Sequence, residues 1–153
     1  LKIPSYYDIA VEMEIKGTTV YGVSPYATTW PHNVKPRCGW GAEDDFFEQN
    51  GKNPASVWAT YHYWDGSCNH KMNQYWYNIS NASTAYHAYG VMRSGGQVRF
   101  YLDGVSKGVS SSYFQSYPMD VSMGMGAYSF EWPADSKLPA YTYVRRIKVW
   151  KKK

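Results

Sequence analysis

Residues 86–107 read YHAYGVMRSGGQVRFYLDGVSK, and this stretch indicates the fold class. Tyr86–Arg93 has the pattern of a strand, and Ser94-Gly95-Gly96 makes a short turn into a second strand at Val98–Leu102. Asp103-Gly104 follows, the dipeptide whose preference for positive φ suits a two-residue hairpin turn, and Val105–Lys107 returns. The stretch therefore predicts a meander of three antiparallel strands.

An alternation of side chains with a period of two residues, as in a β-strand, also occurs elsewhere along the chain. In Tyr7–Ile15 the apolar side chains fall on one face and the acidic side chains on the other, as in a half-buried strand. Further strands are predicted at residues 57–64, 119–128 and 141–150, with long loops at residues 18–41, 66–85 and 129–140. No segment has a convincing helical repeat. We predict an all-β single domain over residues 1–153, built of two packed antiparallel sheets.

Composition excludes several classes of protein. Of 153 residues 44% are hydrophobic and 18% charged, which fits a folded chain rather than a disordered tail or a coiled coil. Charged residues interrupt every apolar run, so no membrane span is predicted. The net charge of +4 comes partly from the final three lysines and is too weak to indicate nucleic-acid binding. A start at Leu1, without Met or an apolar leader, is what a processed or excised product would have.

Cysteine and histidine spacing indicates no metal site. Cys38 and Cys68 are compatible either with one disulfide or with two free thiols, and the sequence leaves both open. No CxxC motif occurs, and His32, His62 and His70 lack the spacing of metal ligands. We therefore expect no metal or cofactor in the reaction and leave a structural calcium ion open.

Aromatic residues are the unusual part of the composition, with 16 Tyr, 7 Trp and 5 Phe. Aromatic side chains suit strands, and their flat faces suit ligands such as sugar rings. Trp58, Trp76 and Trp150 fall in or beside strand patterns, where core packing is an equal interpretation. We predict that the substrate-binding tryptophans are those in or next to the long loops, namely Trp30, Trp40, Trp64 and Trp132.

The highest density of potentially catalytic side chains is in the segment Glu43-Asp44-Asp45-Phe46-Phe47-Glu48. Such a cluster is ordinarily a solvated loop, but two phenylalanines within it indicate a partly buried strand. A strand places Glu43 and Asp45 on one face, and Glu48 joins them only if one extra residue bulges out before it. Paired carboxyls are what glycoside hydrolysis needs, and a third acid between them would drive their pKa values apart.

With these motifs the chain resembles glycoside hydrolase family 16. The resemblance lies, in order, in the motif Glu43-x-Asp45-x-x-Glu48, the Thr60–Tyr63 strand, Tyr86–Val91, the Arg99–Gly104 hairpin and the closing strand. The resemblance implies a concanavalin-like β-jelly-roll sandwich of two curved antiparallel sheets and net retention at β-linkages. It implies Glu43 as nucleophile, Glu48 as general acid/base and Asp45 as the residue that tunes the nucleophile. Among the tryptophans, Trp40 and Trp132 best match those that line the subsites in the family. His62 either hydrogen-bonds the substrate or Glu48, or is a structural histidine.

Three features depart from the family pattern. Asp44 stands where the family has an aliphatic residue pointing between the sheets, so its carboxylate needs a buried partner or the strand is exposed. Arg145-Arg146 stands where the family has an Asp-aromatic pair. The chain is also short, as in a trimmed or minimal member.

Two functions follow from these observations. The first is a secreted, monomeric, retaining endo-β-glycosidase whose partner is a polysaccharide, either a marine galactan such as agar or porphyran or a β-1,3(4)-glucan. The alternative is a non-catalytic jelly-roll module for carbohydrate binding or adhesion, which would have no need of all three acids at this spacing.

Overall fold

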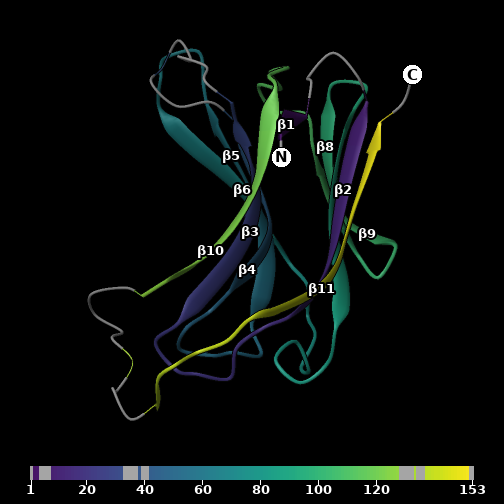
Figure 1. Ribbon diagram of the computed structural model, residues 1–153. Helices are drawn as coiled ribbons and strands as arrows, with labels where there is room; N and C mark the ends of the chain where they lie inside the picture. The colour runs from purple at the N-terminus through teal and green to yellow at the C-terminus, as the bar shows by residue number, and fades with distance from the viewer. Residues whose placement is uncertain are drawn as a thin grey trace.

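The computed structural model describes residues 2–3 (backbone only), 8–32, 38, 42–127, 133 and 137–151. These form two antiparallel sheets packed face to face, with the long strands bending along their length (Figure 1). The first sheet has the order β1-β10-β3-β4-β5-β6 and the second the order β11-β2-β7-β8-β9. The strands are β1 (Lys2–Ile3), β2 (Ile9–Lys16), β3 (Ser24–Pro31), β4 (Glu43–Gln49), β5 (Val57–Trp64), β6 (His70–Trp76), β7 (His87–Ser94), β8 (Gln97–Leu102), β9 (Val105–Ser110), β10 (Met119–Gly126) and β11 (Tyr143–Lys151).

The predicted all-β sandwich is confirmed, and so is the meander. β7, β8 and β9 pair in succession, and both turns have the positive φ angles that two-residue hairpins need. Asp103 and Gly104 have φ of 50° and 78°, and Gly95 and Gly96 have φ of 55° and 75°. The described part of the chain contains no helix with the length and hydropathy of a membrane-spanning segment.

The core lies between the two sheets. β2 contributes the apolar face predicted from its alternation, and these four side chains are at most 4% exposed: Ile9, Val11, Met13 and Ile15. β4 contributes Phe46 and Phe47, both fully buried, and Phe47 packs against Tyr89 of β7 with ring centroids 4.7 Å apart. Burying one such aromatic side chain removes roughly 150–250 Å² of surface from water, so a few of them compensate for the scarce aliphatic residues.

Two strands lie in regions predicted to be loops. β3 falls within the predicted loop 18–41, and its prolines occupy positions near the two strand ends, where a missing N–H is tolerated. β6 falls within the predicted loop 66–85 and lies at the edge of its sheet, so it is mostly exposed on both faces and shows no apolar alternation. Each prediction was wrong because a clear apolar period of two needs one buried and one exposed face, whereas β3 is mostly buried on both faces and β6 is mostly exposed on both.

Asp44 finds its partner on the opposite sheet. Its carboxylate is fully buried and accepts hydrogen bonds from Arg93 Nη1 at 2.7 and 2.6 Å, while Thr29 Oγ1 donates to it at 2.5 Å. Arg93, on β7, is 5% exposed, donates from Nη2 to the Gln115 carbonyl and lies over the Phe114 ring. The departure from an aliphatic residue is therefore compensated by a buried ion pair that joins β4 to the second sheet.

The second departure, Arg145-Arg146, is also accounted for by pairing. Both guanidinium groups contact the carboxylate of Glu14, on the adjacent strand β2, and Lys148 contacts Glu12 of the same strand at 2.8 Å. β11 therefore matches the acidic outer face of β2 with basic residues, which is the cross-strand arrangement that stabilises a sheet.

We expect Arg93→Met to reduce the free energy of unfolding by about 3–5 kcal/mol, because it leaves the Asp44 carboxylate buried without its partner. Adding Asp44→Leu should recover most of the loss, since an apolar pair of similar volume needs no charge compensation. Urea denaturation measures both, and Arg99→Met on the neighbouring strand is the control, with an expected cost of about 0.5 kcal/mol or less. A double variant as unstable as Arg93→Met would contradict this account.

Candidate active site

A β-bulge in β4 places the three acids on one face. Along the neighbouring strand β5, Glu43 lies opposite His62 and Asp45 opposite Thr60, but the next paired residue is Glu48, opposite Trp58. Two residues, Phe46 and Phe47, therefore oppose the single residue Ala59. The bulge predicted from the sequence is present, and the face it creates is the one turned away from the core.

The three carboxyl groups line one pocket of about 350 Å³ on that face. Its walls come from the β3 end, from β4 and from β5, and the lining residues are Ser24, Pro25, Tyr26, Glu43, Asp45, Glu48, Gln49, Asn50, Trp58 and His62. A pocket of this volume is within the range of roughly 300–1,000 Å³ that small-molecule sites occupy. The acids thus converge on a space that can hold a ligand.

Glu43 and Asp45 form a coupled pair. Burial raises the pKa of Glu43, and the Asp45 carboxyl, which shares a hydrogen bond with it, raises that pKa further, with smaller contributions from Glu48 and Asp44. A proton is therefore held on the hydrogen bond between these two side chains at neutral pH.

Glu48 has the properties of an acid that works near neutral pH. Burial, followed by the charge of Asp45, raises the pKa of Glu48 to about 7, although the hydroxyl of Thr60 donates a hydrogen bond to its carboxylate and lowers that pKa. A group with such a pKa can both give and accept a proton at neutral pH, as general acid/base catalysis requires.

His62 connects the acids to the edge of the sheet. Its Nε2 lies 3.3 Å from Asp45 Oδ2, and its Nδ1 shares a hydrogen bond of 2.8 Å with Nε2 of His70 on β6. The two imidazole rings are stacked, with centroids 5.0 Å apart. The sequence left open a hydrogen bond from His62 to the substrate or to Glu48 and a structural position; the acid that His62 contacts in the structure is Asp45.

Of the four predicted substrate-binding tryptophans, the two that the structure describes, Trp30 and Trp64, do not line this pocket. Trp30 and Trp64 lie near the C-terminal ends of β3 and β5, at the Glu43 end of β4 and on the same face as the acids, but outside the pocket lining. Trp64 packs against His70, with ring centroids 4.8 Å apart. Trp40 and Trp132 lie outside the described residues.

Two aromatic residues that sequence reasoning did not select do line the pocket. Trp58 faces it because it pairs with Glu48 across the bulge, so the parity of β5 would have identified it once that register was known. Tyr26 pairs with Glu48 on the other side, and its ring lies over Gly124, where an added Cβ would be 2.6 Å from the hydroxyl oxygen. Glycine at position 124 therefore leaves room for this wall of the pocket.

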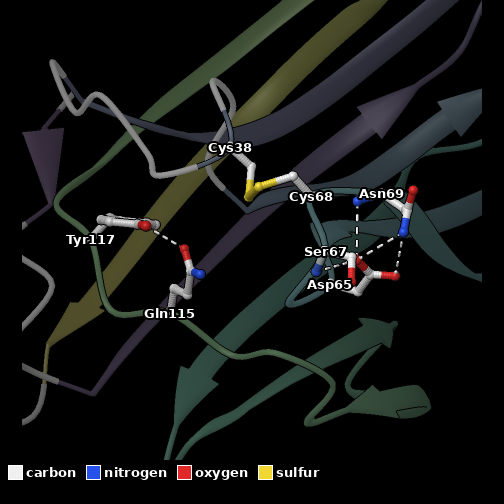
Figure 2. Close-up of a disulfide and its surroundings, with 7 residues drawn as sticks. All are labelled: Cys38, Asp65, Ser67, Cys68, Asn69, Gln115 and Tyr117. Atoms are coloured by element: carbon white, nitrogen blue, oxygen red, sulfur yellow. Dashed lines mark hydrogen bonds between the residues drawn. A yellow bond between two sulfur atoms is a disulfide. The ribbon is translucent and has the colours of Figure 1, made fainter.

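The two cysteines form a disulfide (Figure 2). Cys38 precedes β4 and Cys68 lies in the turn between β5 and β6, so the bond joins the segment before β4 to the turn after β5. Asp65 holds the same turn by accepting hydrogen bonds from the backbone N–H groups of Ser67 and Asn69. Among the described residues, no three His, Cys, Asp or Glu side chains are arranged to hold a metal ion.

The family model described as "Glycosyl hydrolases family 16" matches residues 6–148. The chain belongs to this family. Comparison with curated protein sequences gives no match. The resemblance that the acid motif and the Tyr86–Val91 strand indicated is thereby confirmed over nearly the whole chain.

Solved structures of similar fold include glycoside hydrolases that differ in substrate. The laminarinase catalytic domain from Thermotoga maritima MSB8 is 20% identical with a TM-score of 0.79, and the match covers 100% of this chain and 66% of that one. The endo-β-1,3-glucanase from Pyrococcus furiosus is 19% identical with a TM-score of 0.77, covering 99% and 63%. The κ-carrageenase from Pseudoalteromonas carrageenovora is 18% identical with a TM-score of 0.71, covering 95% and 64%.

These likenesses establish the jelly-roll fold that the sequence indicated. This chain spans slightly less than two thirds of the length of those three structures, so it is short in comparison, as expected.

We expect Thr60→Val to raise the pKa of Glu48 above 7 by about one pH unit, because a hydrogen bond that favours the ionised carboxylate is lost. Carbon-13 NMR titration of the Glu48 carboxyl carbon measures this directly. Thr84→Val, which removes a hydroxyl bonded to the Asn81 carbonyl far from the pocket, serves as the control and should leave the titration unchanged. A fall in the pKa of Glu48 in Thr60→Val would contradict the assigned hydrogen bond.

Proposed function

We propose that the protein is a retaining endo-β-glycosidase that hydrolyses a β-linked polysaccharide. The observation that carries the proposal is the convergence of Glu43, Asp45 and Glu48 on one pocket through the bulge in β4. Membership of glycosyl hydrolase family 16 supports the same reaction class. Both Glu side chains must reach the two faces of one glycosidic bond, which retaining enzymes achieve with carboxyls about 5–5.5 Å apart.

In the first step Glu43 attacks the anomeric carbon, and the bond from that carbon to the glycosidic oxygen breaks. Glu48 donates its proton to the departing oxygen, so one half of the polysaccharide leaves as a neutral alcohol. The other half remains bound to Glu43 as an ester. The attack requires the ionised form of Glu43, and the hydrogen bond with Asp45 positions its carboxyl group.

In the second step Glu48, now ionised, takes a proton from a water molecule as that water attacks the anomeric carbon. The ester bond to Glu43 breaks, and the product has the original β-configuration because two inversions have occurred. His62 supports Asp45 through its Nε2 contact and places a polar group beside the acids.

The substrate class is inferred from the shape and chemistry of the site. The pocket is open, and it combines acids, amides and the aromatic faces of Tyr26 and Trp58, as a site for sugar rings requires. Glucans and galactans are the substrates named for the similar structures, so laminarin, lichenan, agarose and porphyran are the polysaccharides to test. The Cys38–Cys68 disulfide supports action in an extracellular, oxidising environment, and we propose that the protein acts there as a monomer.

The decisive experiment measures reducing ends after incubation with each of these polysaccharides. We expect release by the wild-type protein from at least one of them, and a loss of about 10³-fold or more in Glu43→Gln and Glu48→Gln, since either change removes a group that acts on the reacting atoms. Glu12→Gln, on the outer face of the second sheet, is the matched control and should retain full activity.

The outcomes separate the enzyme from its alternative. Proton NMR of the first product should show the β-anomer before mutarotation, and an α-anomer would exclude retention. Binding to a polysaccharide without release of reducing ends from any of the four would show instead a non-catalytic carbohydrate-binding module.

We further expect kcat/KM to fall as the pH rises through about 7. Glu48 must carry its proton to act on the departing oxygen, and its pKa of about 7 means that this proton is present below that pH and lost above it. A substrate with a 2,4-dinitrophenyl leaving group needs no protonation and is the control, for which the fall should disappear. A polysaccharide profile that stays flat up to pH 9 would rule out Glu48 as the acid.

A further inference from the structure

Trp58 and Trp76 form an aromatic pair that continues beyond the acid pocket. They are direct cross-strand partners on β5 and β6, so both face the same side of the sheet as Glu48. Their ring centroids lie 4.9 Å apart, with the ring planes tilted by 47°. Trp58 lines the acid pocket, whereas Trp76 is 49% exposed at the edge of the sheet.

A second pocket of about 260 Å³ opens beside Trp76. Its remaining walls come from the segment after β4 and the segment after β6, and the lining residues are Asn53, Ala55, Ser56, Val57, Trp76, Asn78, Ile79 and Ser80. One flat indole face with amide and hydroxyl groups around it is the combination that binds a sugar ring, whose faces are apolar and whose rim carries hydroxyls. The volume suits a small ligand such as one sugar residue.

The wall opposite Trp76 is held in place before any ligand binds. In the segment after β4, Asn50 N–H donates to the Ser56 carbonyl at 3.0 Å and Ser56 N–H donates to the Asn53 carbonyl at 2.8 Å. The buried Gln49 side chain donates to the Pro54 carbonyl at 2.6 Å. A preformed pocket binds more tightly than one that must first be ordered.

The charge of the lining also restricts the ligand. The second pocket has no charged side chain, and the described lining of the acid pocket contains no Lys or Arg. A sulfated sugar would need a cationic partner at such a site, because burying an unpaired charge is unfavourable. The lining therefore suits an uncharged sugar.

We propose that the pocket beside Trp76 is an additional subsite that binds one uncharged sugar residue of the polysaccharide held in the acid pocket. This inference rests on the proposed function for the identity of the polymer. The indole of Trp76 stacks on the face of the sugar ring, and Asn53 and Asn78 hydrogen-bond its hydroxyl groups. Trp58 lines the acid pocket and packs against Trp76, so the aromatic pair connects the two pockets.

The test compares Trp76→Ala with Trp150→Ala, a tryptophan of similar exposure on the other sheet. For Trp76→Ala we expect kcat/KM on a neutral polysaccharide to fall about tenfold, as truncation of an aromatic contact at a binding site commonly causes. On the shortest oligosaccharide that is still cleaved, which does not reach the pocket, kcat/KM should not change. Trp150→Ala should change neither value.

Asn78→Gly provides a second variant that keeps the fold. Asn78 has φ of 52°, a conformation that glycine adopts freely, so only the amide group is lost. It should also weaken the polymer reaction while leaving the short substrate unaffected. A thermal unfolding scan confirms that each variant is folded.

Affinity electrophoresis with the Glu43→Gln protein separates failure of this inference from failure of the proposed function. If no hydrolysis is seen but adding Trp76→Ala weakens binding to laminarin, lichenan or agarose, the subsite is supported and only the enzyme proposal is lost. Equal binding with and without Trp76→Ala overturns the subsite, whether or not hydrolysis occurs. A loss confined to sulfated polymers such as porphyran, or no binding to any polymer, overturns it as well.

Discussion

Side chains alternate between the two faces of a β-strand, and this constraint determines which residues of β4 can face the core and which can face the pocket. The strand must send phenylalanines into the core and acids into the pocket within seven residues. A regular strand would turn Glu48 into the core along with Asp44. The bulge at Phe46 and Phe47 resolves the conflict by burying two consecutive rings and then resuming the alternation, so Glu48 returns to the face of Glu43 and Asp45. The position of Glu48 beside the other two acids and opposite Trp58 follows from that one extra residue.

The buried Asp44–Arg93 pair links this strand to the second sheet. Two hydrogen bonds join the carboxylate to the guanidinium group, and Thr29 supplies a third, so the buried charge is compensated on each side. Such a pair is favourable only with good geometry and full hydrogen bonding, because both ions lose their hydration. An aliphatic residue at this position would meet the same need by packing alone. The ion pair adds a directional link from β4 to β7 and to the Gln115 carbonyl, at a position between two of the pocket acids.

The proposed reaction depends on placing acids where their charged forms are costly. Burial raises the pKa of both Glu43 and Glu48, so a folded protein with an empty pocket favours their protonated forms. Protonation therefore stabilises the fold at low pH, and this contribution is lost as the pH rises through the raised pKa values. A site that can exchange protons near neutral pH is thus obtained at some cost in stability at high pH, as is common where function requires buried carboxyls.

Elements whose pattern is local were predictable from the sequence. The buried face of β2 and the two hairpin turns of the meander were identified because apolar alternation and Gly-containing turns are read from adjacent residues. β6 was missed because an exposed edge strand carries no such alternation. That loop tryptophans bind the substrate stays a prediction, and Trp30 and Trp64 do not line the acid pocket. Trp58 was not selected because its facing depends on the register between β4 and β5.

The amino-acid sequence by itself determined the all-β class, the family and the three acids, because each depends on residue type and short spacing. Only the tertiary structure decided which partner neutralises Asp44, that Cys38 and Cys68 are bonded, and which aromatic rings face the acids. The disulfide and the ion pair join residues that are 30 and 49 positions apart in the chain. Their geometry is set by strand order, register and the packing of one sheet on the other, none of which is contained in the spacing of neighbouring residues.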